Sequence, residues 1–266
     1  MGETLEQALT PATWPTFAYV MTRLSGFMLV APLWSLSGVP ARVRAAVAVV
    51  LGIALLPLAP RVVLPVGMLE LPVSMAMEFV LGLAIGLSAA VIVYGMSLAG
   101  EVVSIQMGLS LGPAISPMTE LTVPGIGQLQ SFLAVLIYLS VGGHLMLLRG
   151  LADSLKTLPP GMGIAPLNAP ELATHLLDTV FGTAIQVAAP ALVALLLTHV
   201  AVAITGRAVP QIHAILLAFP LTIGIGLMMV GASLPFTGAM LTDWMAQIPE
   251  RVAQVVQVFR PAAGGP

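Results

Sequence analysis

The chain has 266 residues, of which 58% are hydrophobic and 8% are charged, with a mean hydropathy of +1.05 and a formal net charge of -2. An ordinary soluble domain carries about 25% charged residues, so this chain has too few charges to cover a surface that faces water. The small net charge and the lack of a basic run exclude the surface of a nucleic-acid-binding protein, and the absence of cysteine excludes disulfides and thiolate metal sites.

The first apolar stretch does not have the features of a secretory signal peptide. Such a peptide opens with basic residues, whereas Met1 to Trp14 contains Glu3 and Glu6 and no Lys or Arg. We therefore expect this stretch to be retained.

Apolar segments long enough to cross a bilayer recur along the whole chain. About 20 helical residues are needed, because each residue adds about 1.5 Å toward a hydrocarbon core of about 30 Å. This measure predicts an all-α, polytopic helical membrane-type protein with about six hydrophobic segments. They cover residues 14–34, 43–60, 73–98, 124–148, 172–204 and 209–232. The second is short and the fifth is long, so these segments need not all be simple perpendicular spans.

Gly- and Pro-rich breaks separate the segments, and no long linker divides the chain, so we expect a single domain over 1–266. The two longest connections, 100–123 and 149–171, are rich in Gly, Pro, Ser and Met. Loops of this length are uncommon unless they are functional or disordered, so both are candidate functional segments. The Lys and Arg residues that flank the segments are only slightly more numerous on one side of the membrane than on the other. This difference is too small to fix the topology.

Glu78 lies inside the third segment, where a charge costs several kcal/mol unless it is paired or faces protein or water. Its helical face continues through Gly82 and Gly86, a small-xxx-small pattern that lets another helix approach closely. We therefore interpret this face as a packing surface and expect a buried interhelical partner, for which Arg23 is the candidate. A proton-relay carboxylate is the alternative.

The stretch from Gln106 to Gln128 predicts an apolar but irregular loop. Non-helical backbone at membrane depth is tolerated only where it is buried in protein or lines a cavity. A plug or constriction satisfies that condition, and methionine side chains fill irregular gaps well. The candidate plug residues are Gln106, Met107, Gly108, Gly112, Pro113, Pro117 and Met118.

The residues Gly108 to Gly112 also match the nucleophile-elbow pattern G-x-S-x-G, with Ser110 as the nucleophile. This motif requires a strand before the serine and a helix after it. Here an apolar helix precedes the serine and Pro113 follows it. No His or acidic residue is placed by a recognisable motif to complete a triad, so we expect no enzyme, with an intramembrane hydrolase as the alternative.

A polar row in the fifth segment, His175, Asp178, Gly182 and Gln186, follows one helical face. A metal site would need further ligands nearby, so we expect no metal and no other cofactor. A polar surface at a subunit interface, or a solvated face, is the favoured interpretation. Asp178 and Arg207 are therefore grouped with Arg23, Glu78, Gly82 and Gly86 as helix-packing or buried polar candidates. His199 and His213 are interpreted as hydrogen-bonded packing residues.

Ordered landmarks along nearly the whole chain resemble the FliR family of flagellar biosynthetic proteins, which corresponds to the SctT proteins of virulence type III secretion. Each landmark is weak alone, whereas their joint order is specific. They are Ala31-Pro32, Val39-Pro40-Ala41-Arg42-Val43-Arg44, Glu78-Phe79-Val80-Leu81-Gly82 with Gly86, Ala99-Gly100-Glu101, Gln106-Met107-Gly108-Leu109-Ser110, Gly142-Gly143-His144, Ser154 with Leu158-Pro159, Arg207-Ala208-Val209-Pro210-Gln211 and Phe219-Pro220.

The resemblance implies a structural subunit of the type III export gate in the bacterial inner membrane, within the flagellar basal body. Its implied partners are FliP-like and FliQ-like subunits, FlhB-like and FlhA-like export proteins and exported polypeptides, with membrane lipid and no nucleic acid. It also implies kinked helical hairpins buried against sister subunits, and a plug formed by residues 106–128. A secondary transporter or permease is the alternative function, although we find no repeat relating two halves of the chain.

Overall fold

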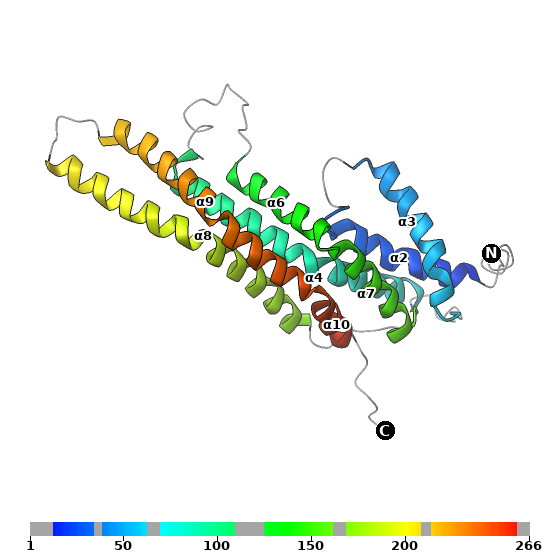
Figure 1. Ribbon diagram of the computed structural model, residues 1–266. Coiled ribbons are helices and arrows are strands. Elements are labelled where there is room, and N and C mark those ends of the chain that lie inside the picture. Colours follow the sequence, from blue (N-terminus) through cyan, green and yellow to red (C-terminus); the bar gives the residue numbers. More distant parts are fainter. Residues whose placement is uncertain are drawn as a thin grey trace. The chain divides into compact units, whose positions relative to one another are not determined.

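The computed structural model describes residues 13–34, 39–62, 70–109, 125–161, 169–208 and 214–259 (Figure 1). Every regular element in these ranges is helical, so the all-α prediction is confirmed. The elements are α2 (Trp14–Val30), α3 (Ala41–Leu55), the 3-10 helix η2 (Leu56–Leu58), α4 (Glu70–Gln106), α6 (Ile126–Ser140), α7 (Gly143–Thr157), α8 (Ala169–Ala208), α9 (Ala214–Ala246) and α10 (Ile248–Val258).

Four of the described helical stretches are long and apolar enough to cross a membrane: Ala41–Leu58, Glu70–Gln106, Pro170–Ala208 and Ala218–Ala246. A fifth is added if α6 and α7 together make one bent span. The first predicted segment gives only the 17 residues of α2, which falls short of that length. At about 1.5 Å per residue, α4 and α8 are much longer than a bilayer core of about 30 Å requires, so neither is a simple perpendicular span.

The predicted span 124–148 is wrong as a single helix. The structure has α6 and α7 in its place, bent by 66° at the break between them. Gly142 occupies this break with a φ of 76°, a left-handed conformation that costs glycine little and other residues more. The connection predicted over 149–171 is also shorter, because residues 149–157 continue α7.

Two more predicted boundaries change in the structure, and one helix was not predicted. Residues 100–106, assigned to a loop by the sequence, complete α4. The sixth segment does not end at residue 232, because α9 continues through Pro235 to Ala246. Proline removes one backbone donor but does not stop a helix whose neighbouring turns remain bonded. Finally, α10 was not predicted; it is a short amphipathic helix whose buried face is Ile248, Val252, Val255 and Val256.

The chain divides into two compact units, and the single-domain expectation stays a prediction. Unit 1 consists of residues 1–91, 139–176 and 245–266, and unit 2 of residues 92–138 and 177–244. In unit 1, α2 packs against α3 and α7 packs against α10 (Figure 1). Its core includes Tyr19, Leu24, Phe27, Leu81, Ile85, Leu147, Leu151 and Phe259. The core of unit 2 includes Ile92, Met96, Val103, Met107, Ala134, Tyr138, Leu195 and Leu241.

Candidate functional site

Arg23 of α2 is the centre of a buried polar cluster in unit 1, which we call the Arg23 hub (Arg23, Glu78, Ser154, Leu158 and Gly161). Its side chain is fully buried. The guanidinium Nε donates to Glu78 Oε2 of α4 at 2.6 Å, and the same atoms form an ion pair. The two terminal nitrogens donate to Ser154 Oγ of α7 at 3.0 Å and to the Leu158 carbonyl oxygen at 2.9 Å.

The Glu78 carboxylate is bonded through both of its oxygens. While Oε2 accepts from Arg23, Oε1 accepts from the backbone N–H of Gly161 at 3.0 Å. Gly161 has a φ of 81°, and a Cβ atom there would lie 2.8 Å from Val62 Cγ1. Glycine at position 161 therefore allows the turn after α7 to present its N–H group to the carboxylate.

The arrangement of the Arg23 hub suits structural packing. One charge is neutralised by the other, and the additional hydrogen bonds satisfy polar atoms that would otherwise be costly to bury. The hub joins α2, α4 and α7 at a single point. A proton relay would require a carboxylate that exchanges protons with water, whereas the Glu78 side chain is 3% exposed.

Next to the Arg23 hub, α2 and α4 approach each other through a glycine seam (Gly26, Gly82 and Gly86). A Cβ atom on Gly82 would collide with the Arg23 carbonyl oxygen, and one on Gly26 would collide with the Phe79 carbonyl oxygen. At Gly86 it would lie 2.8 Å from the Phe27 carbonyl oxygen. The backbones of α2 and α4 therefore pack directly on each other along this seam. The small-xxx-small pattern in α4 indicated such a close approach, but the pattern alone did not identify α2 as the partner.

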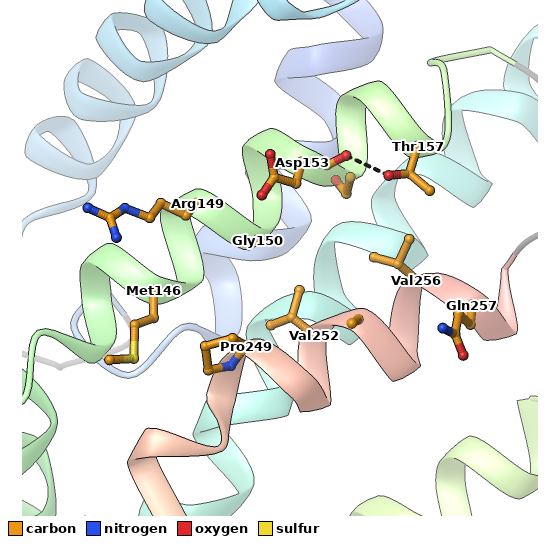
Figure 2. Close-up of a pocket in the computed structure, with 11 residues that line it drawn as sticks. Met146, Arg149, Gly150, Asp153, Thr157, Pro249, Val252, Val256 and Gln257 are labelled. Carbon is orange, nitrogen blue, oxygen red and sulfur yellow. Dashed lines mark hydrogen bonds between the residues drawn. The ribbon is translucent and has the colours of Figure 1, made fainter.

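A groove of about 510 Å³ lies between α7 and α10 (Figure 2). Ser154 is one of its lining residues. In Figure 2, Val252 and Val256 line it from α10, while Met146 and Asp153 line it from α7. Gly150 lets the two helices approach, because a Cβ atom there would lie 2.6 Å from Val252 Cγ1. Sequence reasoning missed this groove, although apolar residues at helical spacing in 248–256 could have indicated α10.

In unit 2 the structure describes only the two ends of the predicted plug loop. Gln106, Met107 and Gly108 lie at the end of α4, whereas Gly112, Pro113, Pro117 and Met118 lie outside the described residues. The Met107 side chain is 1% exposed. Gln106 Nε2 lies 3.5 Å from His199 Nδ1 of α8, in a small cavity also lined by Phe219 and Thr222.

The start of α6, at the other end of this loop, packs tightly on α4. A Cβ atom on Gly100 would lie 2.5 Å from Gly127 Cα, and one on Gly127 would lie 3.0 Å from Glu101 Oε2. The Ala99-Gly100-Glu101 landmark thus forms the surface on which α6 begins. A carboxylate near the first turn of a helix interacts favourably with the helix dipole.

The polar row of α8 is exposed. The side chains of His175, Asp178 and Gln186 are exposed, and a Cβ atom on Gly182 would meet nothing within 4 Å. Arg207 is exposed near the end of the same helix. Asp178 and Arg207 are both exposed among the described residues, and their assignment as helix-packing or buried polar residues stays a prediction.

Within the described part of the chain, the remaining chemical candidates form no assembled site. Ser110 and His213 lie outside the described residues. Among the residues that the structure describes, no three His, Asp or Glu side chains gather as metal ligands. Neither the hydrolase nor the metal alternative therefore gains support from the geometry.

Comparison with known proteins gives a consistent result. The chain is similar to the flagellar biosynthetic protein FliR of Escherichia coli (strain K12), with 27% identity over 134 residues, which is 50% of this chain and 51% of that protein. It is 28% identical over 145 residues to FliR of Aquifex aeolicus (strain VF5), covering 52% and 56%. The chain thus spans about half the length of the curated relatives it matches. The model of bacterial export proteins, family 1, matches residues 14–248, so this chain belongs to that family.

Proposed function

We propose that this chain is a structural component of the flagellar type III protein-export apparatus in the bacterial inner membrane. The observation that carries the proposal is the match of the export-protein family over residues 14–248, supported by the similarity to FliR proteins. Its role is structural, and no enzymatic step is assigned to it. The chain helps to form and close the channel through which flagellar proteins cross the membrane.

Exposed apolar side chains on the long helices support an assembly with other subunits. On α8, Phe181, Ile185 and Leu197 are more than half exposed, and on α9 the same holds for Met228 and Phe236. Lipid or other apolar chains must cover these surfaces. The partners we propose are FliP-like and FliQ-like subunits within the channel, FlhB-like and FlhA-like proteins beside it, and exported polypeptides as cargo.

The segment of residues 106–128, whose first residue ends α4 and whose last residues begin α6, is proposed as the plug that closes this channel. Its apolar side chains would exclude water and ions, and its glycines would let the backbone bend aside for a passing polypeptide. The support comes from its composition and from the resemblance to the FliR family. The well-packed residues at both ends give the loop fixed attachment points.

The partner assignment is tested by purification. The chain is expected to co-purify with FliP-like and FliQ-like chains and to aggregate or exchange between oligomers when it is expressed alone. A stable, monodisperse monomer in mild detergent that has no affinity for these chains would contradict the proposal.

The plug assignment is tested by ion conductance. Deletion of a few residues within 112–118 is expected to leave the complex assembled while making reconstituted membranes leaky to small ions. Ser110→Ala is the matched control, since a plug does not need its hydroxyl whereas a hydrolase would lose activity. Unchanged conductance in the assembled deletion complex would refute the plug, and loss of export in the Ser110→Ala complex would revive the hydrolase.

A further inference from the structure

The end of α4 is held against α9 by one buried side chain. The last helical residue of α4 is Gln106, and Met107 follows it with its side chain 1% exposed. Gly108 then turns the chain with a φ of 82°. This position is the last well-packed point before the loop, so its attachment sets where the loop begins.

Gly226 of α9 provides the space that Met107 occupies. A Cβ atom built on Gly226 would lie 2.6 Å from Met107 Cε, 2.7 Å from Cγ and 2.8 Å from Sδ. Three other glycines of α9, Gly224, Gly231 and Gly238, would meet nothing within 4 Å. Gly226 therefore differs from them in that a side chain already fills the space above it.

Thr222 adds a polar contact one turn before Gly226, on the same face of α9. Its hydroxyl is buried and lies 3.3 Å from the Met107 carbonyl oxygen, within hydrogen-bonding distance. The same hydroxyl also lies 3.0 Å and 3.2 Å from the Ala218 and Phe219 carbonyl oxygens of its own helix. The carbonyl groups in the last turn of a helix lack partners within that helix. The Thr222 hydroxyl thus lies beside the Met107 carbonyl group, while Gly226 receives the Met107 side chain.

We propose that Thr222 and Gly226 form a socket for Met107, the Met107 socket, which fixes the beginning of the plug loop in the closed channel. These three residues act as positioning residues, because they set the place of the loop and do not themselves block the channel. The other end of the loop is fixed by Gly100 and Gly127, which pack backbone on backbone. The proposal rests on the assignment of residues 106–128 as the plug.

The contact itself is tested by cross-linking in the assembled complex. Because the chain contains no cysteine, Met107→Cys combined with Gly226→Cys introduces a single pair. The close approach of the Gly226 position to Met107 Cγ favours disulfide formation under mild oxidation. The matched pair Met107→Cys and Gly224→Cys should remain reduced. Equal cross-linking of both pairs, or of neither, would overturn the socket.

The role of the socket is tested by conductance of complexes reconstituted with FliP-like and FliQ-like chains. Gly226→Ala places a methyl group where Met107 lies, and we expect a severalfold rise in small-ion leak with assembly unchanged. Gly224→Ala adds the same methyl group to open space on the same helix and should leave the leak at the parent level. Equal leaks from the two variants would refute the positioning role.

A double variant separates failure of the socket from failure of the plug. Met107→Ala alone should also raise the leak, and Gly226→Ala should add nothing in that background, because the two changes remove the same contact. Independent, additive leaks would overturn the proposal. If deletion within 112–118 leaks while Gly226→Ala and Met107→Ala do not, the plug stands and the socket is wrong. If none of the three leaks, the plug itself is refuted.

Discussion

Two sets of glycines, one on α4 and one on α9, differ in what lies beside them. At Gly82 and Gly86 in α4, the α2 backbone is so close that an added Cβ atom would collide with it or crowd it. At Gly224 and Gly231 in α9, an added Cβ atom would meet nothing within 4 Å. Small residues at helical spacing thus mark a place where another helix can approach, and only the neighbouring contacts tell whether the same chain supplies that helix.

The largest expected effect comes from breaking the ion pair beside the α4 glycines. Arg23→Met leaves the Glu78 carboxylate buried beside an apolar side chain, which costs about 3 to 5 kcal/mol for a buried pair. We expect the thermal unfolding midpoint in detergent to fall sharply and little assembled protein to accumulate. The double variant Arg23→Met with Glu78→Leu should recover part of this loss, since it leaves no buried charge, although the Leu158 carbonyl and the Gly161 N–H lose their partners. No recovery at all would contradict the view that the unpaired Glu78 charge is the main cause of the loss.

A smaller effect is expected from the seam itself. Gly82→Ala forces the α2 and α4 backbones apart, and overpacking of this kind costs about 1 to 3 kcal/mol. Gly82→Leu should reduce assembly and export further. By comparison, Glu78→Gln keeps the shape and much of the hydrogen bonding, so export should survive it better than Gly82→Leu. Loss of export in an assembled Glu78→Gln complex would favour the proton-relay interpretation.

Alanine substitution at the glycines of α9 that have no neighbour should raise stability, whereas Gly82→Ala lowers it. Gly231→Ala adds a methyl group to empty space and limits the freedom of the unfolded chain, which stabilises a helix by up to about 1 kcal/mol. The unfolding midpoint of the isolated chain in detergent is therefore expected to rise slightly. A fall comparable with that of Gly82→Ala would mean that this face of α9 is already packed.

The smallest effect is expected at an exposed ion pair on α7. Lys156 Nζ lies 3.4 Å from Asp153 Oδ1, with both side chains largely exposed. Water screens such pairs, so Lys156→Ala should change the free energy of unfolding by no more than about 0.5 kcal/mol. An effect as large as that of Arg23→Met would show that the groove beside Asp153 is filled in the assembled protein.

The sequence predicted the helical class and the existence of most long helices, because their apolar composition is continuous. The boundaries of the helices were harder to predict. Apolar composition looks the same in a continuous span and in two helices separated by the bend at Gly142. It also does not show whether a helix ends near Pro235 or continues through it, as α9 does. The free-energy cost of burying a charge suggested that Glu78 needs a partner, and Arg23 in the first apolar segment was the candidate. The bonds from Arg23 to Ser154 and Leu158 depend on tertiary folding, and no local pattern indicates them.

The Arg23 hub also constrains the order in which unit 1 is completed. Arg23 and Glu78 are separated by 55 residues, whereas the bonds to Ser154 and Leu158 span 131 and 135 residues. During synthesis the chain grows from its N-terminus, so the ion pair between α2 and α4 becomes available long before α7 exists. Until residue 161 has emerged, part of the guanidinium and one carboxylate oxygen lack their native partners. These hydrogen bonds join residues that are far apart in the sequence, so their formation is a late step in the folding of unit 1.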